Sequence, residues 1–200
     1  LFGEQRRAAL FLNHPYGRPV IGWRHEMENL TLEDALAYYR QFYAPNNAIL
    51  VVGGDVTPEA VFELAKQIYG VIPANPDLLP RERPQEPPHI SARRITYSDE
   101  RVAQSYVTRT YLAPERNLSD QLVPAALTLL AEILGGGQTS VLTQKLQFEA
   151  QTAVYTTAFY GGTALDDASF GFVIVPYDGV SLEEAEAALD QAIGEFLKEG

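Results

Sequence analysis

The sequence predicts an α+β protein made of two sheet-plus-helices modules joined by a proline-rich linker. Three observations support this fold class. Stretches with helical and with strand-like hydrophobic patterns alternate along the 200 residues, of which 46% are hydrophobic and 20% charged. Six of the 13 prolines lie between Pro73 and Pro88. A strand–turn–helix pattern at 48–69 occurs again at 170–197, which fits an internal duplication or chance, since this arrangement is common.

The proline cluster divides the chain. Proline fixes φ, lacks an amide proton and biases the residue before it away from helix. Polar residues fill the spaces between these prolines, so we expect an extended, semi-rigid linker near 73–91. A long loop inside one domain is the alternative, although long structureless loops are uncommon in compact domains.

Before the linker, capping signals set the helix boundaries. Thr31 precedes Asp34 by three residues, which is the spacing of a capping box. Thr57 precedes Pro58, a residue favoured at the first helical position. An unbroken apolar run of strand length predicts a buried strand. The elements expected here are the end of a helix at 1–12, a turn cluster at 14–19, helices at 32–43 and 57–69, and a strand at 48–53.

After the linker, the same kinds of signal recur. Ser119 is expected to open a helix in which Pro124 kinks or delays the first turn and which ends at the Gly135–Gly137 triplet. Ser181 and Glu184 have the spacing of a capping box for the last helix. The other elements expected here are strands at 93–98, 103–112, 153–160 and 168–175, and helices at 139–150 and 182–198.

Composition excludes several classes of function. The net charge is −11, and residues 101–200 hold 5 basic and 13 acidic side chains. A chain this acidic, without a basic patch, is not expected to bind nucleic acid. The chain has no cysteine, which excludes disulfides, thiol catalysis and cysteine-ligated metals. No apolar run approaches the length of a membrane span.

The three histidines do not form a recognisable metal motif. A zinc-binding helix needs a second ligand four residues after the first, but His14, His25 and His89 are followed at that distance by arginine or asparagine. His25 comes nearest, in a His-x-x-Glu-Asn segment, but we expect this segment to lie in a turn. The spacing of the histidines therefore favours a surface or loop-bracing role for His25 over a role as a metal ligand.

Three segments nevertheless resemble one family. The segment 14–22 (HPYGRPVIG), the segment 43–55 (YAPNNAILVVGGD) and the segment 134–142 (LGGGQTSVL) resemble the pitrilysin (insulinase) family of zinc metallopeptidases, which includes mitochondrial processing peptidase. Each motif alone is moderately specific. Together they occur in order and at the expected separations, and the resemblance covers essentially the whole chain.

The resemblance implies two homologous α+β halves that enclose a peptide chamber. On this map, residues 1–72 are the C-terminal part of the first domain, 73–92 the linker and 93–200 the N-terminal part of the second domain, so both modules are partial. In the family, zinc is held by an HxxEH helix and a downstream glutamate, and the HxxEH glutamate is the general base on a metal-bound water. These residues would precede Leu1. We therefore expect zinc in the full-length parent but none in this segment, which alone should be inactive.

The resemblance also suggests two residues of the substrate chamber. Some members direct an arginine and a tyrosine of the second half toward the substrate. The matching positions are Gln147 and Val154, with Tyr155 one step away, so Gln147 and Tyr155 are the candidates. Glutamine cannot supply a cationic contact. The pair would then come from a partner subunit, or the parent is an inactive homologue.

Three functions remain open from the sequence. The first is a fragment of a zinc-dependent metalloendopeptidase that hydrolyses peptides in an enclosed chamber, with this segment forming the wall. The second is a non-catalytic structural or partner subunit of a peptidase-like complex, and the third is a free-standing peptide-binding module. The expected partners are a peptide substrate and a homologous second subunit or a second copy. Bacterial members are often exported, which favours the periplasm, with the cytoplasm as the alternative because the absence of cysteine fits both.

Overall fold

The structure is a computed structural model and describes residues 1–118 and 120–199. Contacts divide the chain into two compact units, one formed by Leu1–Gly17 together with Gln85–Gly200 and the other by Arg18–Pro84. Helices pack on a small antiparallel sheet in the first unit, so the predicted mixture of α and β structure is confirmed. No helix within the described residues is long and apolar enough to cross a bilayer.

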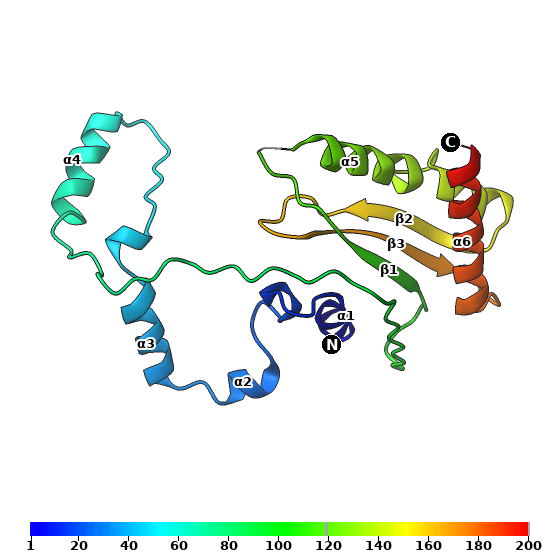
Figure 1. Ribbon diagram of the computed structural model, residues 1–200, viewed down its shortest axis with the longest axis horizontal. Coiled ribbons are helices and arrows are strands. Elements are labelled where there is room, and N and C mark those ends of the chain that lie inside the picture. Colours follow the sequence, from blue (N-terminus) through cyan, green and yellow to red (C-terminus); the bar gives the residue numbers. More distant parts are fainter. Residues whose placement is uncertain (119, 200) are drawn as a thin grey trace. The chain divides into compact units, whose positions relative to one another are not determined.

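The larger unit is built on a three-stranded antiparallel sheet. Its strands are β1 (Val107–Ala113), β2 (Ala153–Tyr160) and β3 (Ala168–Pro176), in the order β1-β3-β2 (Figure 1). The sequence prediction placed the last two strands within one residue of these bounds. Arg109 of β1 lies opposite Phe172 of β3, and such directly paired residues share one face of the sheet.

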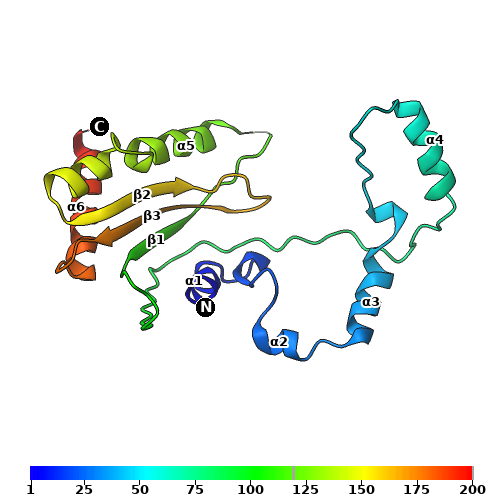
Figure 2. The same cartoon turned by 180° about the vertical axis from the view of Figure 1, so that it is seen from behind.

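Helices cover one face of this sheet. They are α5 (Leu122–Gly135), the π-helix η3 (Thr143–Glu149) and α6 (Leu182–Glu199), and Figure 2 shows the same arrangement from behind. Leu142, Ile174 and Leu189 are completely inaccessible to solvent. The rest of the core cluster consists of small and aromatic side chains from the same elements, among them Ala131, Leu134, Leu146, Ala158, Phe170, Phe172 and Ala185.

The first seventeen residues pack on the same unit. Helix α1 (Phe2–Leu10) is followed by the 3-10 turn η1 (Pro15–Gly17). The Arg6 guanidinium donates to the Thr108 hydroxyl at 2.9 Å. Thr108 adjoins Arg109 in β1, so its side chain points to the face of the sheet opposite the helices α5 and α6.

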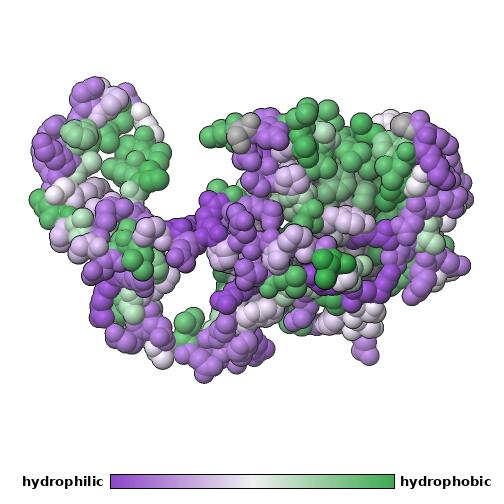
Figure 3. All heavy atoms as spheres, viewed as in Figure 1, coloured by the Kyte–Doolittle hydropathy of each residue, from purple (hydrophilic) through white to green (hydrophobic). Residues whose placement is uncertain are grey.

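In the unit formed by residues 18–84 the only regular elements are helices, and the unit has no core. Its elements are α2 (Arg24–Glu28), α3 (Leu32–Phe42), the 3-10 turn η2 (Pro45–Asn47) and α4 (Pro58–Ile68). Not one residue of 18–84 is buried. Large apolar side chains are instead exposed, as Figure 3 shows on the surface of this unit.

The capping signals in the sequence are confirmed. The Thr31 hydroxyl accepts from the Asp34 amide and the Asp34 carboxylate accepts from the Thr31 amide, which completes the capping box of α3. Ser181 and Glu184 make the same exchange at the start of α6. Pro124 lies in the first turn of α5, where its missing amide leaves no helical hydrogen bond unmade. Ser119, the expected start of that helix, lies outside the described residues.

Three local predictions are wrong. Residues 48–53 and 93–98 were expected to be strands, but neither has a paired strand beside it within residues 1–118 and 120–199, although Ala48 has extended dihedrals. An apolar run predicts extended backbone, whereas a strand also requires a neighbour to exchange hydrogen bonds. His25 lies in the short helix α2 and not in a turn. The helix expected at 139–150 is present, but mostly in the π form.

The predicted domain boundaries rest on homology between two halves, whereas the compact units of the structure are defined by contacts. Residues 1–72, 73–92 and 93–200 were assigned as parts of two homologous halves and a linker. The division into compact units follows contacts, and it groups the first seventeen residues with the C-terminal unit. Contacts do not address homology between halves, so the predicted boundaries stay a prediction.

Candidate functional site

The candidate residues lie where the π-helix η3 meets strand β2. Three hydroxyl groups are buried there, those of Ser140, Thr143 and Thr156. The Ser140 hydroxyl donates to the Gly137 carbonyl at 2.7 Å and lies 3.0 Å from the Thr143 hydroxyl. The Thr143 and Thr156 hydroxyls lie 3.4 Å apart. This chain of hydroxyls satisfies polar groups that would otherwise be costly to bury.

Gln147 joins this cluster. Its Nε2 donates to the Thr156 hydroxyl at 2.9 Å and to the Thr143 hydroxyl at 3.3 Å. The side chain is therefore directed back into the polar cluster between η3 and β2 and is only half-buried. In this conformation both amide protons of Gln147 have partners within the protein.

Tyr155 lies on the other side of strand β2. A β-bulge interrupts the pairing here, because Ala153 pairs with Pro176 and Tyr155 with Val175, which leaves Val154 as the extra residue. Tyr155 and Thr156 are consecutive after the bulge, so their side chains point to opposite faces. Tyr155 is 52% exposed.

The structure thus separates the two candidate residues. Gln147 bonds to Thr156 on the helix-covered face, whereas Tyr155 points away from it. No hydrogen bond or ring contact joins Gln147 to Tyr155 in the part of the chain that is described. A role of either residue in a substrate chamber stays a prediction. The hydroxyl cluster was not foreseen, although three threonines or serines within residues 139–143 were a visible signal.

A groove of about 490 Å³ lies between α5, α6 and strand β1. Its floor is apolar, with Phe170 and Phe172 from β3, and Arg109 lies at its rim. The other lining residues are Tyr111, Leu112, Ala113, Pro114, Val123, Leu127, Asp190 and Ile193.

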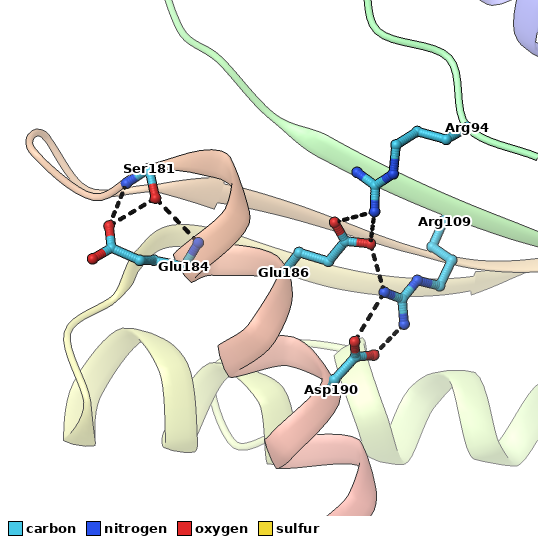
Figure 4. Close-up of polar contacts among 6 residues, drawn as sticks. All are labelled: Arg94, Arg109, Ser181, Glu184, Glu186 and Asp190. Carbon is cyan, nitrogen blue, oxygen red and sulfur yellow. Dashed lines mark hydrogen bonds and ion pairs between the residues drawn. The ribbon is translucent and has the colours of Figure 1, made fainter.

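Arg109 belongs to a chain of four alternating charges, drawn in Figure 4. Its Nη2 donates to Glu186 at 2.8 Å, its Nη1 contacts Asp190, and the Arg94 Nη2 donates to the other oxygen of Glu186 at 2.6 Å. Hydrogen bonds from Arg94 and Arg109 lower the pKa of Glu186, and the bond from Arg109 lowers the pKa of Asp190. All four groups are consequently charged at neutral pH. The arginines are matched by carboxylates and do not present a free cation to the groove.

The residues present do not fit a zinc site. No group of three His, Asp or Glu side chains within residues 1–118 and 120–199 is arranged to hold a metal ion. The His14 Nε2 lies 3.2 Å from Asp166, and the His89 Nε2 lies 3.3 Å from Glu86. His25 is exposed in the helix α2. The rings of His14 and His89 thus contact different carboxylates, although the His14 backbone amide also donates to Glu86.

Among residues 1–118 and 120–199 no histidine is placed to act as a base on a hydroxyl nucleophile. Across the described ranges, no histidine is hydrogen-bonded to a serine or threonine hydroxyl. The buried hydroxyls bond to one another, to a carbonyl oxygen and to Gln147. The site thus consists of a hydrogen-bonded polar cluster beside a sheet with an exposed tyrosine.

Comparisons with known proteins identify the relatives of this chain. It is 30% identical over 192 residues to the zinc protease PqqE of Helicobacter pylori, a match that covers 95% of this chain and 42% of that protein. It is 29% identical over 151 residues to an uncharacterized zinc protease of Mycobacterium leprae, covering 72% of this chain and 32% of that protein. The chain therefore spans less than half the length of these relatives.

Solved structures have the same fold. The crystal structure of a protease from Helicobacter pylori aligns with a TM-score of 0.76 at 27% identity, covering 96% of this chain and 46% of that one. The periplasmic protease PqqL from Escherichia coli aligns with a TM-score of 0.80 at 21% identity, covering 100% of this chain and 22% of that one. At the lower identity the likeness shows the fold alone.

The family profile described as the peptidase M16 inactive domain matches residues 29–200. This match includes the second and third of the motifs that pointed to the pitrilysin family, and the relatives named above are zinc proteases. The resemblance seen in the sequence is therefore confirmed. Because the match spans most of the chain, the protein belongs to the peptidase M16 inactive-domain family, the pitrilysin-type family that its motifs resemble.

Proposed function

We propose that this chain is part of a zinc-dependent metalloendopeptidase and forms part of the wall of its peptide chamber. The family match over residues 29–200 carries the proposal. Relatives of more than twice its length are named zinc proteases. On this proposal the chain contains the end of one α+β half and the beginning of a homologous second half.

The zinc belongs to the parent protein and not to this segment. On this proposal its ligands lie N-terminal to the motif at 14–22. Equilibrium dialysis of the 200-residue chain with zinc should give no tight stoichiometric site. Sub-micromolar binding that His14→Ala or His25→Ala removes would contradict the proposal.

The second test is the sequence of the parent upstream of Leu1. An HxxEH motif there supports a peptidase, whereas a degenerate motif would instead indicate a non-catalytic partner subunit. The substrate is expected to be a peptide, and a homologous subunit or a second copy is expected to complete the chamber. Periplasmic localisation is part of the proposal, on the basis that bacterial members of the family are often exported.

Gln147 offers a third test. Its amide is held by Thr143 and Thr156, and the segment lacks a general base, so an arginine at this position has nothing to activate water. The Gln147→Arg and Val141→Arg variants of this chain should therefore show no peptide cleavage. Measurable cleavage of a quenched fluorescent peptide by either variant would contradict the assignment of catalysis to residues outside this segment.

A further inference from the structure

The segment 12–14 is held by a single carboxylate from a distant part of the chain. Glu86 Oε1 accepts from the Leu12 amide at 2.5 Å, and its Oε2 accepts from the Asn13 and His14 amides at 2.9 Å each. The Glu86 side chain is 0% exposed. Three consecutive amides thus converge on one buried anion, and we name this arrangement the Glu86 clamp. Hydrogen bonds to a charged acceptor are stronger than those between neutral groups.

A second set of contacts attaches the same segment to the loop between β2 and β3. His14 is 6% exposed, and its Nδ1 accepts from the Tyr16 amide at 3.2 Å. The ring proton is therefore assigned to Nε2, which donates to Asp166 Oδ2 at 3.2 Å. The Tyr16 hydroxyl accepts from the Leu165 amide at 3.2 Å.

Helix α1, by contrast, is lightly held. None of its residues is buried, whereas His14 and Gly17, just after it, are. Its contacts are the Arg6 bond to Thr108, ring contacts of Phe2 with Tyr97 and Tyr106, and the Arg93 guanidinium on the Ala9 carbonyl. Attachment of the whole segment 1–17 therefore depends on its last few residues.

The clamp also joins two points of the chain that bracket the 18–84 unit. The chain leaves the larger unit after Gly17 and returns at Gln85. The Asn13 side-chain amide donates to the Gln85 carbonyl at 3.2 Å, beside the clamp.

We propose that residues 1–17 form a latch that the Glu86 clamp holds shut, and that loss of the clamp releases the latch as one unit from β1 and from the β2–β3 loop. If Glu86 withdraws, three amides lose their acceptor together, so the segment has to expose them to water. Once residues 12–14 move, His14 and Tyr16 lose their places on the loop. The remaining contacts of α1, whose residues are at most half-buried, are then too few to keep it in place. This conformational device is independent of the proposed peptidase function.

Hydrogen–deuterium exchange of the complete chain tests the latch. Glu86→Gln keeps the shape of the side chain but removes its charge and replaces one acceptor oxygen with the NH2 donor of an amide. We expect exchange in this variant to be at least tenfold faster across residues 2–16 and also in the loop 161–167. Exchange in α5 and α6 should stay unchanged, because they pack on the opposite face of the sheet. Glu82→Gln, an exposed residue of the same proline-rich stretch, is the matched control and should change nothing.

Two outcomes would overturn the proposal. If Glu86→Gln accelerates exchange only at residues 12–14 and leaves α1 and the loop 161–167 protected, the clamp is a local cap and not a latch. If α5 and α6 lose protection as well, Glu86 supports the whole unit and controls no separate movement. Asp166→Asn tests the second attachment of the segment, the contact between His14 and the loop that joins β2 and β3. It should release residues 2–16 on its own, and the double variant should exchange no faster than the faster single variant.

Discussion

Helices α6 and α4 are similar in sequence design but differ in what covers them. Both begin with a capping hydroxyl, Ser181 for α6 and Thr57 for α4, and both have one apolar face. Helix α6 buries Ala185, Leu189 and Ala192 against the sheet. Helix α4 buries nothing, and its Phe62 is 66% exposed. Local capping specifies where a helix begins, whereas stability of a folded unit requires that its apolar face be covered.

The same contrast extends to the two units as wholes. The larger unit has a contiguous core, and the 18–84 unit has none. We therefore expect them to unfold differently. The single tryptophan of the chain, Trp23, lies in the 18–84 unit and reports on it separately, while circular dichroism follows both units. Transitions that coincide by the two probes would show that the units fold together.

The largest expected effect comes from the core of the larger unit. Leu189 is completely buried, so Leu189→Ala should lower the free energy of unfolding by about 2–5 kcal/mol. Phe62→Ala in α4 should change it by about 0.5 kcal/mol or less, because Phe62 is exposed. Urea unfolding followed by circular dichroism measures both. An equal loss of unfolding free energy in the two variants would contradict the difference in burial between the units.

A pair of glycine substitutions tests the closeness of packing. An added Cβ at Gly135 would lie 1.9 Å from the Ala158 nitrogen, so helix α5 touches strand β2 there through backbone alone. Gly135→Ala should cost about 1–3 kcal/mol. Gly194 in α6 has open space around it, and Gly194→Ala should add up to about 1 kcal/mol. Thermal unfolding of both variants checks the pair, and a stable Gly135→Ala protein would disprove the close contact.

The free energy of unfolding should also depend on pH, because Glu86 is ionised in the folded protein. Burial raises the pKa of this carboxyl, but hydrogen bonds from the Asn13, Leu12 and His14 amides and from His89 outweigh burial and lower the pKa to about 2. A lowered folded-state pKa stabilises the fold above the ordinary value of 4.5, and this contribution is lost as the pH falls from 4.5 toward 2.

The measurement is a urea series between pH 7 and pH 2.5, carried out on the natural chain and on Glu86→Gln. The natural chain should lose stability in this window, and Glu86→Gln should lose less of it. An identical pH dependence in both proteins would mean that Glu86 is not ionised in the clamp.

The smallest expected effect concerns the caps. Ser181→Ala should lower the free energy of unfolding of the larger unit by about 1 kcal/mol, because the Glu184 amide loses its acceptor. Thr31→Ala removes the equivalent bond in α3 but should leave the cooperative transition unchanged and only reduce the helical signal. A shift of the transition midpoint by Thr31→Ala would mean that α3 contributes to the cooperative core.

Sequence reasoning succeeded where the determinant is local. Thr31, Ser181 and the β2 and β3 strands could be placed because caps and apolar alternation act over a few residues. It failed at 48–53, where a strand depends on a neighbour that the local sequence does not reveal. The π-helix η3 and the positive φ of Gln151 at 51° were also missed, since neither leaves a distinct pattern of apolar residues.

In the candidate site, too, the local features could be predicted and the tertiary contacts could not. The sequence identified Gln147 and Tyr155 through a family resemblance. It could not reveal that Gln147 bonds to Thr156 on the helix-covered face, while the bulge at Val154 and strand alternation direct Tyr155 to the other face. It gave no indication of the Glu86 clamp, because an acidic residue in a proline-rich stretch is ordinarily solvated. Such a contact joins residues more than seventy positions apart and is set by tertiary structure alone.

The order of the strands bears on how this protein resists amyloid-like stacking. Residues 169–175 of β3 are rich in aromatic and β-branched side chains and have neither charge nor proline, which is the composition of a fibril-forming segment. In the order β1-β3-β2 this strand is paired along both sides and offers no free backbone to another molecule. Detachment of either β1 or β2 would therefore expose a side of β3 to which another molecule could add a strand.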